Sequence, residues 1–192
     1  MKKNLLLTAL ILLGIHSFSQ EKEIKLENKK VTPNELGIFD TDLLSPSFHK
    51  ERREKLRELM PANSVAILYS SPIRNRSNDV DYEYHQDPNF YYLTGLKEPH
   101  SVVIIYKEKI KIEGIETNEI ILVQPRNANK ELWLGKRMGV DGVKHILKFN
   151  AVFANSELEK LKLDLNKSER VFFIADKNDT RDTRSESDLY DL

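Results

Sequence analysis

Five short runs of apolar residues, each set between polar or turn-forming residues, do most to restrict what this chain can fold into. The runs cover residues 65–69, 90–93, 102–106, 119–123 and 171–174. β-Branched and aromatic residues dominate them, and runs of this length are typical of β-strands. Because their apolar residues are mostly continuous rather than alternating with polar ones, we expect strands that are buried on both faces.

Helical patterns lie between these runs. Ser45 and Pro46 are typical of a helix start, and Pro61 follows the expected end of that helix. One side of the helix is expected to carry Phe48, Arg52, Leu56, Leu59 and Met60. Residues 142–148 indicate a second short helix, residues 151–153 a brief strand, and residues 155–165 a capped helix with Leu158, Leu161 and Leu165 along one side.

The order of these elements predicts the fold class. Residues 102–106 and 119–123 are expected to pair as an antiparallel hairpin with a polar crossing around residues 113–118, and the alternating Lys and Glu of residues 107–111 form its solvated edge. Strands that alternate with helices but include a hairpin indicate an α/β sandwich around a mixed β-sheet flanked by helices.

The N-terminus predicts export from the cytoplasm. Lys2 and Lys3 precede an apolar run at residues 5–15, and small residues follow at 17 and 19, which is the three-part pattern of a cleavable signal peptide. We place the signal peptide at residues 1–19 and the product in the periplasm or outside the cell. The apolar run is too short for a membrane span, which needs roughly 20 residues. Polar residues 20–44 are expected to form a linker or a loosely held arm.

Composition excludes several classes of protein. The chain has no cysteine, which rules out a disulfide framework, a thiol nucleophile and a cysteine zinc site. It has 30 basic and 30 acidic residues, and removing the signal peptide with Lys2 and Lys3 leaves 28 basic against 30 acidic residues, a formal charge of −2. Since no basic stripe stands out along the sequence, we expect no nucleic-acid partner.

One acidic stretch could in principle bind a metal ion. Asp79, Asp81, Glu83 and His85 alternate, so in an extended strand their side chains would share a face. A calcium loop is excluded because it needs glycine at its sixth position and glutamate at its twelfth. Counted from Asp79, those positions hold Tyr84 and Phe90. The simpler interpretation is a solvated loop in which nearby arginines, Arg74 and Arg76, offset the acids.

Other catalytic signatures are missing from the sequence. There is no His-Glu-x-x-His motif, no phosphate-binding loop and no Gly-x-Ser-x-Gly elbow. The isolated histidines His49, His100 and His145 are interpreted as surface residues rather than as ligands. A nucleophilic mechanism therefore has no visible centre in this chain.

Two sequence blocks resemble a known family. Residues 76–95, RSNDVDYEYHQDPNFYYLTG, with Glu98-Pro99 after them, resemble the N-terminal domain of aminopeptidase P, the Xaa-Pro aminopeptidases, which is similar to the N-terminal domain of creatinase and prolidase. Residues 131–139, ELWLGKRMG, resemble a second block of that domain. The resemblance extends over about residues 45–174, and we assign residues 45–176 to this domain.

The resemblance implies a function that this domain serves without performing the chemistry. Members of the family are two-domain enzymes whose C-terminal "pita-bread" domain holds two metal ions, usually manganese, through two Asp, one His and two Glu. A hydroxide between the metals attacks the peptide bond before a proline in the second position. That catalytic domain is absent here, so no catalytic residue, metal ligand or cofactor is assigned to this chain.

The polar tail at residues 177–192 is similar to the start of an interdomain segment. We therefore expect the chain to be a fragment or truncated product of a longer peptidase, and to be inactive alone.

In the family, the N-terminal domain shapes substrate access and builds a homo-oligomer. Trp133 is the first candidate for a contact with substrate or with a neighbouring subunit, and the alternative is that it packs on the sheet. Four residues of the first block are further candidates for a wall of the substrate pocket, or else hold their loop by hydrogen bonds: Arg76, Tyr84, His85 and Asn89.

Two other functions remain as alternatives. One is a stand-alone exported module for binding or assembly, without catalysis. The other is an RNase-H-like nuclease that would bind two metals through Asp79, Asp81 and Glu83, although the chain lacks the basic surface that such an enzyme needs.

Overall fold

The computed structural model describes residues 44–163 and 165–174. The predicted signal peptide at residues 1–19, nearly all of the predicted arm at residues 20–44 and the polar tail at residues 177–192 lie outside this part. Among the described residues, no helix has both the length and the apolar character that a bilayer crossing requires.

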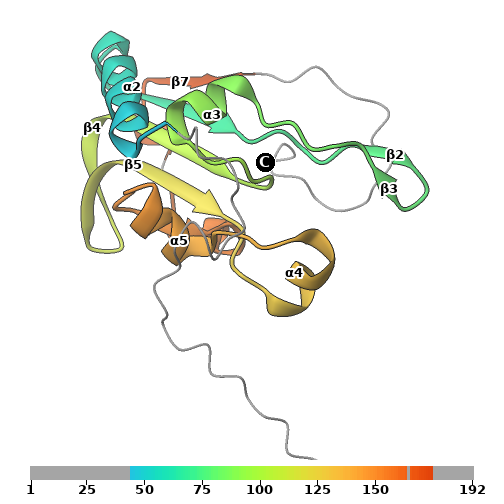
Figure 1. Cartoon of the computed structure of the whole chain (residues 1–192). Helices are drawn as coiled ribbons and strands as arrows, with labels where there is room; N and C mark the ends of the chain where they lie inside the picture. Colours follow the sequence, from blue (N-terminus) through green and yellow to red (C-terminus); the bar gives the residue numbers. More distant parts are fainter. Residues whose placement is uncertain (1–43, 164, 175–192) are drawn as a thin grey trace, which may run out of the picture. The chain divides into compact units, whose positions relative to one another are not determined.

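The described residues form an α/β fold with a mixed five-stranded sheet, which confirms the predicted fold class (Figure 1). In chain order the elements are α2 (Pro46–Leu59), β1 (Ser64–Tyr69), β2 (Asn75–Ser77), β3 (Val80–Asp81), α3 (Pro88–Thr94), β4 (Val102–Ile112), β5 (Ile115–Val123), α4 (Ala128–Leu134), α5 (Gly139–Ile146), β6 (Val152–Ala154), the 3-10 helices η2 (Asn155–Leu161) and η3 (Leu165–Lys167), and β7 (Arg170–Phe173). The strand order is β6-β5-β4-β1-β7. Strand β4 is antiparallel to β1 and β5, whereas β6 and β7 run parallel to their neighbours.

The predicted hairpin is present, with longer strands and a shorter turn than expected. Strands β4 and β5 pair from Val102↔Leu122 to Ile112↔Ile115, so the polar crossing shrinks to Glu113 and Gly114. Both turn residues have positive φ, 44° and 79°, which is the backbone that a two-residue hairpin turn requires. Gly114 adopts it without steric cost.

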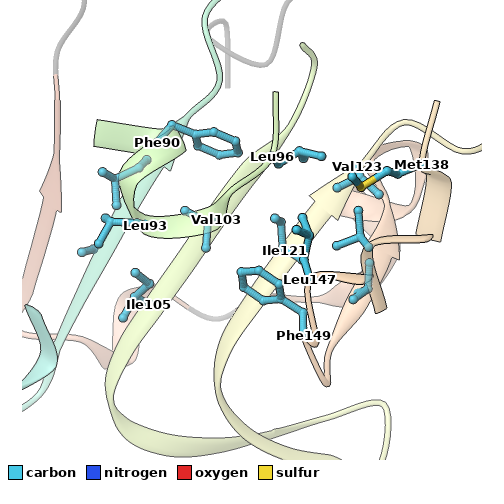
Figure 2. Packing of buried hydrophobic residues seen from close by; sticks show 14 of the residues in the cluster. Phe90, Leu93, Leu96, Val103, Ile105, Ile121, Val123, Met138, Leu147 and Phe149 are labelled. Carbon is cyan, nitrogen blue, oxygen red and sulfur yellow. The ribbon is translucent and has the colours of Figure 1, made fainter. Parts of the chain in front are cut away.

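Each face of the sheet carries its own apolar core. On one face, Ala66 and Leu68 of β1 join residues of β4 and β5 beneath α2, α3 and α5 (Figure 2). On the other face, Val65 and Ile67 pack with Ile104 and other residues under η2 and η3. Alternate residues of β1 thus enter opposite cores, which confirms that this strand is buried on both faces.

Helix α2 begins as predicted but turns a different face to the core. The Ser45 side chain accepts a hydrogen bond from the Phe48 backbone N–H at 3.2 Å, which is a helix cap. Leu56 and Met60 contact the core, but Leu59 is 85 % exposed. The buried positions are instead two polar residues, His49 and Arg53, so the prediction that His49 lies on the surface is wrong.

Arg53 can be buried because each of its three guanidinium nitrogens donates a hydrogen bond. It is 1 % exposed, and its Nε and one terminal nitrogen each donate to the Glu119 carboxylate at 2.9 Å. The other terminal nitrogen donates to the Leu93 carbonyl at 2.7 Å, and the guanidinium carbon lies 4.0 Å from the centre of the Phe149 ring. Arg57 adds a further bond to Glu119 at 2.9 Å. A bidentate pair of this kind compensates for the loss of hydration on burial.

The expectation of a strand at residues 90–93 is wrong, because these residues lie in helix α3. Asp87 caps the helix by accepting from the Phe90 N–H at 2.8 Å, and Pro88 occupies the first turn. Gly95 ends it with φ 73°. These three residues are the usual start and stop signals of a helix, and they outweigh the strand preference of the aromatic residues between them.

The last strand is placed as predicted but is not buried. Strand β7 pairs with β1 in parallel at the edge of the sheet, yet Val171, Phe172 and Phe173 are 41 %, 44 % and 64 % exposed. The predicted helix at 142–148 begins earlier, at Gly139, and the expected helix at 155–165 forms two 3-10 segments.

Replacing Glu119 with glutamine tests how strongly the fold depends on the buried ion pair. We expect Glu119→Gln to lower the free energy of unfolding by about 3 kcal/mol, because Arg53 would stay buried without a countercharge. Urea denaturation measures this. The matched control is Glu116→Gln on the same strand, where the side chain is 70 % exposed and pairs with Lys109 at 3.4 Å. That substitution should cost less than about 0.5 kcal/mol.

The pH dependence of the same variant provides a second readout. Burial acts to raise the pKa of Glu119, but hydrogen bonds and charges from Arg53 and Arg57 together lower it below the ordinary 4.5. A lowered pKa in the folded state gives stability that is present above the unfolded-state pKa and lost as the pH falls through the folded-state pKa. The gap in unfolding free energy between wild type and Glu119→Gln should therefore be full at neutral pH and shrink below pH 4.5. A gap that widens on acidification would contradict this assignment.

Candidate functional site

Helix α4 presents an apolar surface to solvent. It contains no buried residue, and its last turn carries Leu132, Trp133 and Leu134 with 82 %, 88 % and 54 % of their area exposed. In Figure 1 the helix projects away from the five-stranded sheet. The alternative that Trp133 packs on the sheet is therefore not what the structure shows. A tryptophan this exposed beside two leucines is typical of a binding surface.

The base of α4 is held firmly even though its tip is exposed. Asn127 caps the helix by accepting from the N–H groups of Asn129 and Lys130 at 3.1 and 3.0 Å. Arg126 donates two hydrogen bonds to Glu131, at 3.0 and 2.8 Å, and these bonds lower the pKa of the Glu131 carboxyl. At Gly139, φ is 63° and a side chain would lie 2.6 Å from Cγ of Arg126. These contacts hold the base of α4 and so set the position of the exposed residues at its tip.

Gln86 organises the other sequence block. Its Oε1 accepts from the Ser71 and Asp87 N–H groups at 2.8 and 2.9 Å, and its Nε2 donates to the Leu96 and Glu98 carbonyls at 3.1 and 2.9 Å. One side chain therefore joins both ends of the segment that contains α3. Sequence reasoning did not single out Gln86. The available signal was an amide, able to donate and accept, beside the helix start at Asp87-Pro88.

The candidate residues of this block divide into one that holds the loop and three that face solvent. Tyr84 donates from its hydroxyl to the Ser71 carbonyl at 3.0 Å and is half-buried, which agrees with the loop-holding interpretation. Arg76, in β2, is exposed, as are His85 and Asn89, the latter in the first turn of α3. These three residues are thus accessible to a partner.

The acidic stretch does not form a metal site in the described part of the chain. No group of three or more His, Asp or Glu residues there comes close enough to hold an ion. Val80 and Asp81 of this stretch form strand β3, which pairs with β2 in a two-stranded ribbon. The Asn75 side chain of β2 donates to the carbonyls of Asn78 and Val80 at 3.0 and 3.2 Å. The two-metal nuclease interpretation has no geometric support in these residues.

Comparison with known families gives a match over most of the described residues. The family model described as "Aminopeptidase P, N-terminal domain" matches residues 49–173. Both blocks, residues 76–95 and residues 131–139, fall within the match. The resemblance inferred from those blocks is confirmed.

Relatives and solved structures agree with this match. The chain is 34 % identical over 134 residues to intermediate cleaving peptidase 55 of Schizosaccharomyces pombe, covering 69 % of this chain and 27 % of that protein. It is 31 % identical over 111 residues to the Xaa-Pro aminopeptidase of Escherichia coli, covering 58 % and 24 %. The structure of Pseudomonas aeruginosa aminopeptidase PepP is similar with a TM-score of 0.63 and 29 % identity, over 70 % of this chain and 30 % of that one. The matched part is thus about a quarter of the length of these relatives.

Proposed function

Because the chain belongs to the aminopeptidase P N-terminal domain family, we propose that it is the accessory domain of a longer, exported Xaa-Pro metalloaminopeptidase. In that role it shapes the entrance to a catalytic pocket and contributes to a homo-oligomer. The substrates would be peptides with proline in the second position, and the bond before proline would be cleaved by a C-terminal catalytic domain. A proline there removes the amide hydrogen and restricts the backbone, so its peptides need a dedicated enzyme.

The exposed tip of α4 is the observation that carries this role. Leu132, Trp133 and Leu134 form an apolar surface on a helix that is anchored at its base by Asn127 and the Arg126–Glu131 pair. An anchored aromatic residue loses little conformational freedom when it docks, which makes it suited to a wall or a subunit contact. We propose Trp133 for that contact and the exposed Arg76, His85 and Asn89 as further parts of the same wall.

The metal chemistry of such an enzyme would not come from this domain. The described residues contain no group of His, Asp or Glu that fits a metal ion, so they do not fit the dinuclear centre of the family. We place the two manganese ions in the C-terminal domain and assign no step of the reaction to a residue of this chain. Strand β7, with its exposed apolar residues, offers a surface on which further chain of the parent protein would pack.

Export is proposed from the N-terminal pattern alone. The charged start, apolar run and small residues at positions 17 and 19 favour cleavage after Ser19 and a location in the periplasm or outside the cell. Mass spectrometry of the exported protein should find a mature chain that begins at Gln20. A chain that retains residues 1–19 in its mature form would argue against this location.

The alternative is a stand-alone exported module that binds or assembles without catalysis. Its support is that the described residues carry exposed apolar surface but no group of three or more His, Asp or Glu residues that could hold a metal ion. This alternative requires a stable complex that persists without metal. Size-exclusion chromatography of the 192-residue chain alone, in the presence of a chelator, tests whether such a complex forms.

The chain alone should be inactive. We expect no release of the first residue from an Xaa-Pro peptide when the 192-residue chain is incubated with manganese, because its described residues bring together no group that could hold a metal ion. Mass spectrometry of the products measures this, and an active aminopeptidase P serves as the positive control. Hydrolysis that follows the amount of chain and stops with a chelator would overturn the assignment of the chemistry to another domain.

Trp133→Ala in the full-length parent tests the proposed wall. We expect a loss of turnover on an Xaa-Pro peptide, or of subunit association, of about tenfold or more, because a buried interface tryptophan is worth about 2 kcal/mol. The domain itself should unfold at an unchanged temperature, since the side chain is 88 % exposed. The control is Leu59→Ala, which removes an equally exposed apolar side chain from a different helix, α2. If turnover and association are both unchanged, Trp133 has no part in the site.

A further inference from the structure

An apolar groove with a volume of about 270 Å³ lies beside the start of helix α2. Its walls come from the residues that lead into α2, those that follow α3, and both ends of α5. We call it the α2–α5 groove, and its apolar side chains are Leu44, Pro46, Met138, Ile146 and Leu147. An apolar cavity of about 150 Å³ is enough to hold a benzene molecule, so this groove can take an aromatic ring.

The described part of the chain begins at this groove. Leu44 is the first described residue, and it both lines the groove and is 47 % exposed. A fully extended chain advances by at most about 3.6 Å per residue, so Phe39 lies within about 18 Å of Leu44. The chain itself therefore holds the residues just before Leu44 close to the groove.

These residues have the apolar character that the groove requires. Ile38 and Phe39 stand side by side, and Phe39 is the only aromatic residue of the predicted arm. Removing such side chains from water is favourable. Asp40 and Asp42 follow them, and the exposed Lys97 on the wall of the groove carries the opposite charge. The segment and the groove are therefore complementary in both polarity and charge.

The short connection favours this segment over other occupants. A segment joined to its site by a few residues meets that site at an effective concentration on the order of millimolar. A free molecule, or the same segment of a second copy of the chain, would have to reach that concentration to compete equally. The entropy cost of closing the connection is also small, because it grows with the length of the loop.

We propose that Ile38 and Phe39 dock in the α2–α5 groove of their own chain. Their side chains would pack against the apolar wall of the groove, while Asp40 and Asp42 lie toward Lys97. The docked segment would tie the arm to both ends of α5 and cover apolar surface that the described residues leave open. This inference rests on the groove and on the adjoining sequence, and it does not depend on the proposed peptidase role.

Methionine methyl groups offer a direct test in the 192-residue chain. Met138 lines the groove, whereas Met60 belongs to the same apolar core but follows the far end of α2. With ¹³C-methyl methionine labelling, we expect Phe39→Ala to shift the Met138 signal and to leave Met60 unchanged, because an aromatic ring would no longer lie beside that methyl group. The control is Leu26→Ala, an apolar position farther from the groove in the same arm, which should leave both signals unchanged.

Proteolysis of the segment provides a second readout. Endoproteinase Asp-N cuts before aspartate, and a docked segment is cut only when it opens. Ile146→Glu places a charge in the groove and leaves the segment itself untouched, so we expect cleavage before Asp42 to be at least about tenfold faster than in the wild type. Cleavage before Asp182 in the polar tail is the internal reference. The matched control is His145→Glu, at the exposed neighbouring position outside the groove, which should be cut as the wild type is.

Three results would overturn the proposal. These are an unchanged Met138 signal in Phe39→Ala, equal cleavage before Asp42 in the wild type and in Ile146→Glu, and protection that grows with protein concentration. An unchanged Met60 signal shows that each variant is folded. The third result would place the segment of a neighbouring copy in the groove. None of them bears on peptide turnover or on Trp133, so failure here is distinguishable from failure of the proposed function.

Discussion

Arg53 ties helix α2, helix α3 and strand β5 together through one guanidinium group. It binds the Glu119 carboxylate of β5 with two hydrogen bonds and the Leu93 carbonyl of α3 with a third, and it stacks on Phe149. Helix α2 can therefore lie on the sheet in only one rotation, the one that points Arg53 inward. An apolar residue would tolerate some sliding, whereas a buried charge requires its partner at a fixed place. The position of His49, one turn earlier, follows from the same rotation.

This constraint separates what the sequence could predict from what it could not. The strands at residues 65–69, 102–106 and 119–123 were predictable because their apolar residues are continuous and local. The inward face of α2 was not, because the burial of Arg53 depends on partners such as Glu119, which lies 66 positions away in sequence. Residues 90–93 favoured a strand by composition, yet Asp87, Pro88 and Gly95 fixed a helix by local capping. The exposure of β7 was not predictable either. How deeply a strand is buried depends on the elements packed against it, which its own residue pattern does not specify.

The two sequence blocks of the family have different physical tasks. In the first, Gln86 and Tyr84 are partly buried and hold the path of the chain around α3, whereas Arg76, His85 and Asn89 are exposed. In the second, Leu132, Trp133 and Leu134 are exposed at the tip of a helix whose base is anchored by Asn127 and the Arg126–Glu131 pair. The candidate site was therefore predictable in outline from Trp133 alone. Gln86 required the structure, because its role depends on contacts with backbone groups that sequence patterns do not reveal.

The parallel pairing of β1 with β7 affects the order in which the sheet is completed during synthesis. Ser64 lies opposite Arg170, a separation of 106 residues, whereas β4 and β5 pair across a two-residue turn. Because a ribosome releases the chain from its N-terminus and local contacts form first, the β4–β5 hairpin can assemble early and β1 can join β4 next. The outer edge of β1 then stays open until residues 170–173 emerge. For that interval an apolar strand with unpaired backbone groups is exposed, and its open edge can pair with another chain.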